Sequence, residues 1–138
     1  MQPAVKRIIH SLICILPFAV LFALTELFFK DAYLFAWMRE HWYLLLFAAA
    51  AVIGFINFKA GAAFSLSYFV SLTAAQLIGD AVQKHRAARI TADMSEGESS
   101  KLMENNPAFA IWLAVFAELL LFCVIFAILR RRKSGASA

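Results

Sequence analysis

Four long apolar runs separated by charged residues dominate the pattern of this chain. Each run is 17 to 22 residues long, which is the length of a helix that crosses a bilayer. We therefore predict an all-α polytopic integral membrane protein, a bundle of four transmembrane helices forming a single membrane domain. The predicted helices cover residues 8–29, 42–58, 60–82 and 107–130.

The third run is the least secure of the four because five polar residues dilute it. These residues are Ser65, Ser67, Ser71, Thr73 and Gln76. A protein with three spanning helices and one helix lying in the membrane interface is therefore the structural alternative.

The segments outside the membrane are few. We predict an extramembrane loop over residues 83–106, with a flexible turn at residues 95–100, where Ser, Glu and Gly gather. Asn106 and Pro107 suit the start of the last helix, as N-cap and first helical residue. Residues 134–138 are predicted to be a disordered tail.

Composition and charge agree with a membrane protein. The chain is 63% hydrophobic and 16% charged, with a net charge of +4. Its basic residues flank the apolar runs and form no stripe on a soluble face, which excludes a nucleic-acid partner and leaves the lipid bilayer.

The same charges predict the orientation. With four spans, the side of the termini carries seven Lys and Arg residues and the opposite side carries six. The positive-inside rule therefore favours cytoplasmic N- and C-termini, in the inner membrane of a prokaryote. The margin of one residue leaves dual topology as an alternative.

One acid lies near the middle of the last apolar run. Glu118 has ten residues of the run before it and eleven after it, so its carboxyl is expected close to the bilayer midplane. An ionisable residue at that depth is costly and often marks an ion or substrate pathway. Ala110, Ala114 and Ala117 share its face, and small residues permit close helix packing. We therefore predict that this face packs inward. There the carboxyl either exchanges a proton or remains neutral as a hydrogen-bond donor within the bundle or between subunits.

The third helix carries a polar stripe. At 100° per residue, one arc of the helix holds Ser65, Tyr68, Thr73, Gln76, Asp80 and Gln83. Such a stripe either holds the bundle together by hydrogen bonds between helices, which we favour, or lines a pore.

Two further acids are candidates for the same pathway. Glu26 and Asp80 are expected at the non-cytoplasmic ends of the first and third helices, where contact with water is the simpler interpretation. An acidic vestibule, formed together with Asp31 and Glu40 and leading to Glu118, is the alternative.

An enzyme is disfavoured, because the sequence holds no nucleophile–base pair, no ligand motif for a metal and no phosphate-binding loop. We expect no cofactor and no metal. Cys14 and Cys123 lie in separate apolar runs and are interpreted as small apolar residues.

Two function classes remain. The first is a homo-oligomeric transporter or channel for a small ion or solute, with Glu118 as its titrating site and Ser65, Tyr68, Thr73, Gln76, Asp80 and Glu26 along the pathway. The second is a non-catalytic accessory or assembly subunit bound to a larger membrane protein. A holin-like pore former is a variant of the first. We prefer transport, because an accessory role does not require an acid at the midplane.

Overall fold

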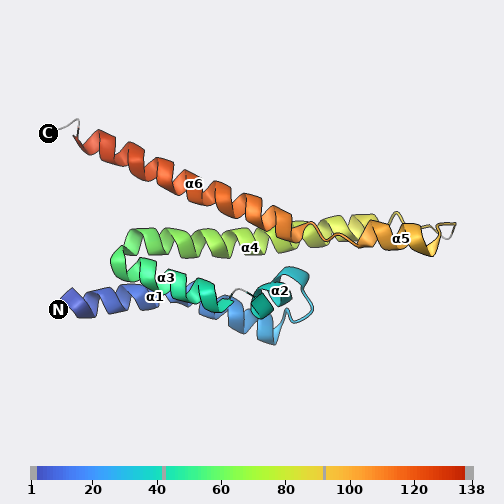
Figure 1. Cartoon of the computed structure of the whole chain (residues 1–138), viewed down its shortest axis with the longest axis horizontal. Coiled ribbons are helices and arrows are strands. Elements are labelled where there is room, and N and C mark those ends of the chain that lie inside the picture. The colour runs from blue at the N-terminus through green and yellow to red at the C-terminus, as the bar shows by residue number, and fades with distance from the viewer. Residues whose placement is uncertain (1–2, 42, 92, 136–138) are drawn as a thin grey trace.

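The chain folds into long helices that run side by side. A computed structural model describes residues 3–41, 43–91 and 93–135, and within these ranges there are six helices. They are α1 (Pro3–Leu27), α2 (Tyr33–His41), α3 (Tyr43–Ile56), α4 (Phe58–Ala87), α5 (Glu96–Met103) and α6 (Ala108–Gly135). The start of α1, the end of α6 and the α3–α4 junction lie at the same end of the molecule, and α2 and α5 lie toward the opposite end (Figure 1).

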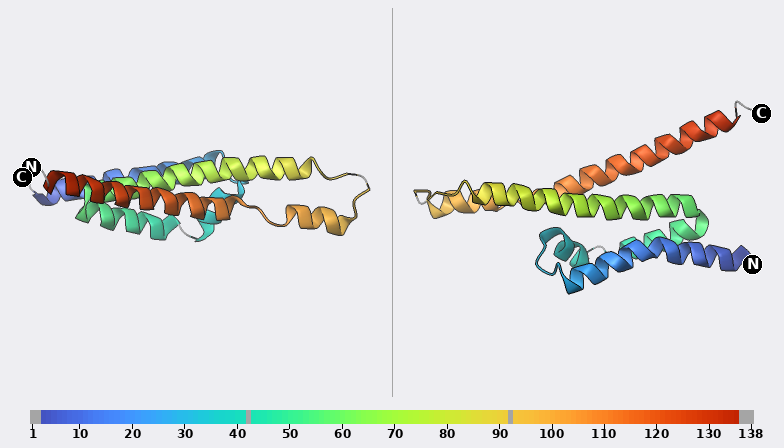
Figure 2. Two further views of the ribbon diagram at one scale, coloured as in Figure 1. Left: turned by 90° about the horizontal axis from the view of Figure 1, so that it is seen from above. Right: turned by 180° about the vertical axis from the view of Figure 1, so that it is seen from behind.

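Helix α4 is the centre of the bundle, with α1 and α3 on one side and α6 on the other (Figure 2). It buries small and polar residues along its length, among them Gly61, Ser65, Ser71, Ala75 and Gly79. The polar residues that dilute this run therefore reflect a position inside the bundle. α4 is long and apolar enough to cross a bilayer, as are α1 and α6.

The second predicted span differs most from expectation. Helix α3 has 14 residues, about 21 Å at 1.5 Å per residue, which is shorter than the roughly 30 Å of a bilayer core. The short helix α2 precedes it at an angle of 73°, and only the bent pair together is long enough to count as a fourth span. The weak span is thus residues 42–58, and residue 42 itself lies outside the described residues. The protein has three candidate spans, or four with the bent pair.

Close contacts between glycines and alanines set the distances between the helices. A Cβ atom placed on Gly61 of α4 would lie 2.6 Å from the Cα atom of Gly54 in α3. A Cβ atom placed on Gly79 would lie 2.5 Å from the Cβ atom of Ala108, the first residue of α6. α4 therefore meets α3 and α6 at positions where no larger residue fits.

The loop after α4 is more ordered than the sequence predicted. The expected turn at residues 95–100 contains the start of α5, where the Ser95 hydroxyl accepts from the Glu98 backbone and the Glu98 carboxylate accepts from the Ser95 backbone. These hydrogen bonds hold the pKa of Glu98 below its usual value. Residues 134 and 135 of the predicted tail belong to α6, which continues through Gly135. Residues 136–138 lie outside the described residues.

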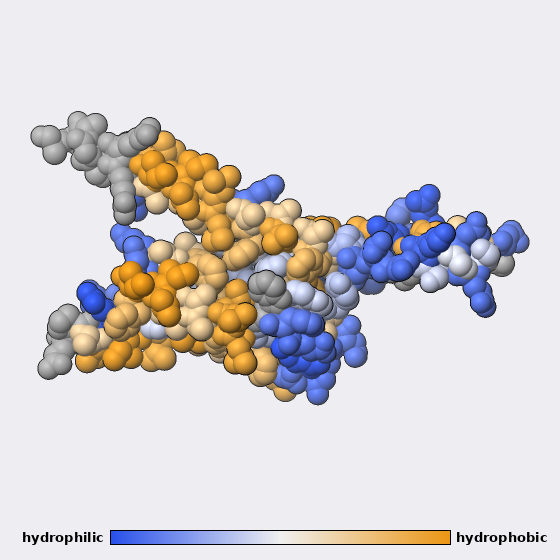
Figure 3. Space-filling view, viewed as in Figure 1, coloured by the Kyte–Doolittle hydropathy of each residue, from blue (hydrophilic) through white to orange (hydrophobic). Residues whose placement is uncertain are grey.

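The surface divides into an apolar and a polar part. Apolar residues cover α6 and the bodies of α1 and α3, and polar residues cover the end formed by α2, α5 and the end of α4 (Figure 3). Large side chains such as Leu44, Ile56 and Phe122 are at least two-thirds exposed. An exposed apolar surface of this extent fits contact with lipid tails.

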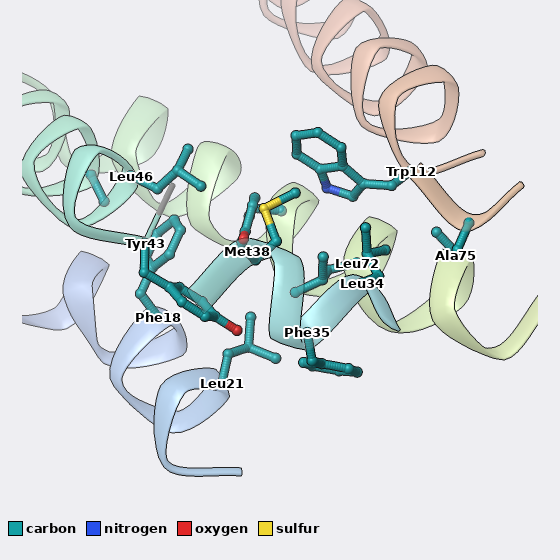
Figure 4. Close-up of a cluster of buried hydrophobic side chains, with 13 residues drawn as sticks. Phe18, Leu21, Leu34, Phe35, Met38, Tyr43, Leu46, Leu72, Ala75 and Trp112 are labelled. Atoms are coloured by element: carbon teal, nitrogen blue, oxygen red, sulfur yellow. The ribbon is translucent and has the colours of Figure 1, made fainter. Parts of the chain in front are cut away.

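An aromatic cluster fills the space between the helices. Phe18 of α1 stacks on Tyr68 of α4 with ring centroids 4.8 Å apart, and Trp112 and Phe116 of α6 meet the other edges of Tyr68 at 6.0 and 5.9 Å. Leu34 and Met38 of α2 enter the same cluster and are fully buried (Figure 4). The core is thus built from α1, α2, α3, α4 and α6 around Tyr68.

A methyl group at Gly61 should push α3 away from α4. Gly→Ala in a helix interior normally gains about 0.5–1 kcal/mol, but the clash with the Gly54 backbone should make Gly61→Ala destabilising by about 1–3 kcal/mol. Thermal unfolding in mild detergent, followed by circular dichroism, measures the difference. Gly97→Ala is the matched control, because a Cβ atom there has no neighbour within 4 Å. Equal effects of the two substitutions would contradict the packing.

Candidate functional site

Glu118 lies on the side of α6 that faces away from the bundle. Its side chain is exposed, as are those of Ala110, Ala114, Ala117 and Leu121. We call these five residues the outer face of α6. The prediction that this face packs inward is therefore wrong for a single chain.

The reason is that α6 meets α4 through its aromatic residues. Trp112 is 4% exposed, Phe116 is half-buried, and Cys123 approaches Ser67 of α4. At 100° per residue, Glu118 lies roughly 120–140° around the helix from Trp112 and Cys123. Large aromatic rings bury more apolar area than alanines, so they decide which face turns toward α4.

No side chain in the described part of the molecule forms a hydrogen bond or ion pair with the Glu118 carboxyl. The carboxyl lies at the eleventh residue of α6, about 15 Å along the helix axis from Ala108. At that depth a charged side chain costs roughly 3 kcal/mol or more in contact with lipid. The outer face of α6 therefore needs a polar partner or water.

The polar stripe of α4 lies inside the bundle, where its hydroxyls bond to backbone. The Ser65 hydroxyl donates to the carbonyl of Cys14 in α1 at 2.7 Å and is also within 2.9 Å of the Gly61 carbonyl. The Thr73 hydroxyl donates to the Phe69 carbonyl of its own helix. Ser65 thus joins α4 to α1, whereas the hydrogen bond of the Thr73 hydroxyl stays within α4.

Gln76 and Asp80 form a short hydrogen-bond chain with α2. The Leu34 backbone N–H donates to Gln76 Oε1 at 2.8 Å, and Gln76 Nε2 donates to Asp80 Oδ1 at 2.7 Å. Leu34 is the second residue of α2, so its N–H has no acceptor within that helix. The buried amide of Gln76 supplies one and holds the start of α2 against α4.

Glu26, near the end of α1, forms an ion pair with Arg39 of α2. Arg39 Nη1 lies 3.3 Å from Glu26 Oε1, and Arg39 Nη2 lies 3.8 Å from Glu40 Oε1. Both side chains of the closer pair are about one-third exposed. Arg39 therefore balances the charge of two acids of the expected vestibule.

Three buried polar atoms lack hydrogen-bond partners among the described residues, which the sequence does not predict. They are the Tyr68 hydroxyl, the Trp112 indole Nε1 and Gln83 Oε1. Tyr68 belongs to the predicted polar stripe, whereas nothing in the apolar run around Trp112 indicates a buried polar atom without a partner. Tyr68 and Trp112 lie in the aromatic cluster. Because buried polar atoms normally form hydrogen bonds, the Tyr68 hydroxyl and the Trp112 indole N–H require water or another polar group as a partner.

The structure thus divides the predicted site residues into separate groups. Gln76 and Asp80 are hydrogen-bonded, Ser65 and Tyr68 lie in the helix contacts, Thr73 bonds within α4, and Glu26 pairs with Arg39. Glu118 lies apart on the outer face of α6. Within residues 3–41, 43–91 and 93–135, no three His, Cys, Asp or Glu side chains are grouped to hold a metal ion.

Comparison of the chain with family models, with curated proteins and with solved structures gives no match.

Replacing Gln76 should loosen α2. Gln76→Leu removes the acceptor for the Leu34 N–H and the donor to Asp80, which should cost about 1–3 kcal/mol. Hydrogen–deuterium exchange of the first turn of α2 should become faster. Thr73→Val is the control, because its hydroxyl bonds only within α4 and its loss leaves α2 untouched. Unchanged exchange of α2 in Gln76→Leu would refute its role as the cap.

Proposed function

We propose that the protein is a homo-oligomeric transporter or channel for a small ion or solute, in which Glu118 carboxyls of neighbouring copies line the passage. The observation that carries the proposal is the position of Glu118. It is exposed on α6, at mid-depth of the apolar run, and flanked by small residues.

Contact with a second copy can give this carboxyl a polar neighbour, which lipid tails cannot. In a symmetric oligomer the same surface of each copy faces a common axis. Ala110, Ala114 and Ala117 permit close approach of α6 helices, and Glu118 would then meet its own equivalents. A ring of acidic side chains is a common selectivity element of cation pathways.

The polar stripe of α4 serves a different purpose in this proposal. Its hydroxyls and amide are engaged with α1, α2 and the backbone of α4 itself. These contacts fit a scaffold that fixes α6, so that the titrating group of the passage is Glu118 alone. The interpretation of the stripe as bundle-forming contacts is retained, and the pore interpretation moves to the outer face of α6.

The proposed orientation has both termini in the cytoplasm of a prokaryotic cell. The start of α1, the end of α6 and the α3–α4 junction lie at the same end of the molecule (Figure 1), and Lys6, Arg7, Lys59 and Arg130 belong to this end. The positive-inside rule supports this side as the inner one.

An accessory subunit is the second candidate, and one observation favours it. Helix α6 contacts the bundle on one side only and leaves most of its apolar surface exposed. A helix of another membrane protein would cover the same outer face. In that case Glu118 would be a hydrogen-bonding residue in a contact between different chains.

Flux measurements in liposomes test the transport proposal. Purified protein should conduct at least one of H⁺, Na⁺ and K⁺ above the leak of protein-free liposomes. Glu118→Gln keeps the shape of the side chain and removes its charge, and it should lower that flux by at least about tenfold, a change equivalent to one lost ionic contact. Glu104→Gln makes the same chemical change in the exposed segment before α6 and should leave the flux unchanged.

Equal flux in Glu118→Gln and wild type would remove Glu118 from the passage. A wild-type protein that conducts none of the three ions, and that purifies with a stoichiometric second membrane protein, would support the accessory subunit instead.

A further inference from the structure

A cavity opens between the terminal half of α6 and the α3–α4 junction. The two helices meet at Gly79 and Ala108 and diverge from there toward the C-terminus (Figure 1). The hollow between them measures about 940 Å³ and is visible in Figure 3 as the notch between α6 and the rest of the molecule. This volume lies within the roughly 300–1,000 Å³ of ordinary ligand pockets.

The walls of this cavity are apolar over most of their length. Small residues create the space, and they are Ala60 and Ala63 of α4 and Ala127 of α6. Phe64 closes the inner end, where its ring contacts Phe116 with centroids 5.7 Å apart. Leu120, Val124 and Phe126 complete the wall on α6. A hydrocarbon chain fits such a surface, and a polar solute does not.

The mouth of the cavity is cationic. Lys59 at the start of α4 and Arg130 near the end of α6 line it together with Asn57. In sequence, Arg130 is followed by Arg131, Arg132 and Lys133. No Asp or Glu occurs in residues 1–25, 41–79 or 119–138, the segments to which the parts of α1, α3, α4 and α6 at this end of the molecule belong. The side chains of these segments therefore have a net positive charge.

We propose that this cavity binds an anionic glycerophospholipid of the bilayer, with one acyl chain between α4 and α6 and its phosphate at Lys59 and Arg130. Charge complementarity selects the headgroup, because basic pockets between transmembrane helices bind anionic lipids. The apolar walls select a lipid rather than a free phosphate. This site uses the side of α6 next to α4, so it does not depend on the proposed role of the outer face.

Native mass spectrometry tests the site. The protein in mild detergent is mixed with equal amounts of phosphatidylglycerol and phosphatidylcholine that have the same acyl chains. Wild type should retain phosphatidylglycerol in preference. Lys59→Gln and Arg130→Gln should each lower that preference roughly fivefold, the effect of one basic residue near an anionic lipid. The paired variant Lys84→Gln with Arg89→Gln removes two exposed charges at the opposite end and should retain the preference.

A second variant tests binding of the acyl chain separately from binding of the headgroup. Ala63→Leu with Ala127→Leu fills the cavity and leaves both cations in place, so it should reduce retention of both lipids. The proposal is overturned if Lys59→Gln and Arg130→Gln both keep the wild-type preference. It is also overturned if excess glycerol phosphate displaces phosphatidylglycerol, or if the filled variant retains both lipids as wild type does.

Discussion

The close approach of α4 to its neighbours is the constraint on which the rest of the structure depends. At Gly61 the backbone of α4 meets the backbone of α3, and at Gly79 it meets Ala108 of α6. Without a hydrophobic driving force between helices in lipid, packing of this kind and hydrogen bonds between helices hold a bundle together. Ser65 adds a hydrogen bond to α1, and Gln76 adds one to α2. Every other helix of the bundle is therefore positioned by α4.

The contact at Gly79 also determines what α6 exposes. It fixes the start of α6 close to α4, where Asn106 Oδ1 accepts from the Ala108 N–H at 2.9 Å and Arg86 Nη1 donates to the Asn105 carbonyl at 2.6 Å. From there the two helices diverge, with Cys123 of α6 still close to Ser67 of α4, and α6 presents two different surfaces. One borders the apolar cavity with its cationic mouth. The other carries Glu118 among small residues, and it is the surface for which lipid is the poorest neighbour.

Much of the fold follows from the sequence because length and hydropathy are strong signals in membranes. The predicted helices at residues 8–29, 60–82 and 107–130 each overlap a candidate spanning helix, and Asn106 caps the start of α6 as its residue type predicts. The run at residues 42–58 was misleading, because an apolar pattern does not reveal that α3 has only 14 residues and that α2 crosses it at 73°. α2 itself lies between the first two predicted helices, where the sequence predicts no helix.

Which face of α6 packs against α4 could not be predicted from the sequence, for a physical reason. Both of its faces can pack closely, one through alanines and the other through Trp112 and Phe116. Which face meets α4 depends on the shape that α4 offers, namely the Tyr68 ring and the gap at Gly79. The sequence of α6 by itself favours the alanines, whereas the complementary surface on α4 favours the aromatic rings. For the same reason the hydrogen bond from Leu34 to Gln76 had no sequence signal, since its donor is a backbone N–H.

The central claim is that the outer face of α6 meets the same face of a second copy, and disulfide cross-linking in native membranes tests it most directly. A chain with Cys14→Ala and Cys123→Ala would carry a new cysteine at Ala117, beside Glu118, or at the lipid-facing position Val70 of α4. Under mild oxidation, Ala117→Cys should give a covalent product with the mass of two copies, and Val70→Cys should remain monomeric. A chain with Ala117→Cys that stays monomeric, or that links only to a protein of different mass, would contradict the claim.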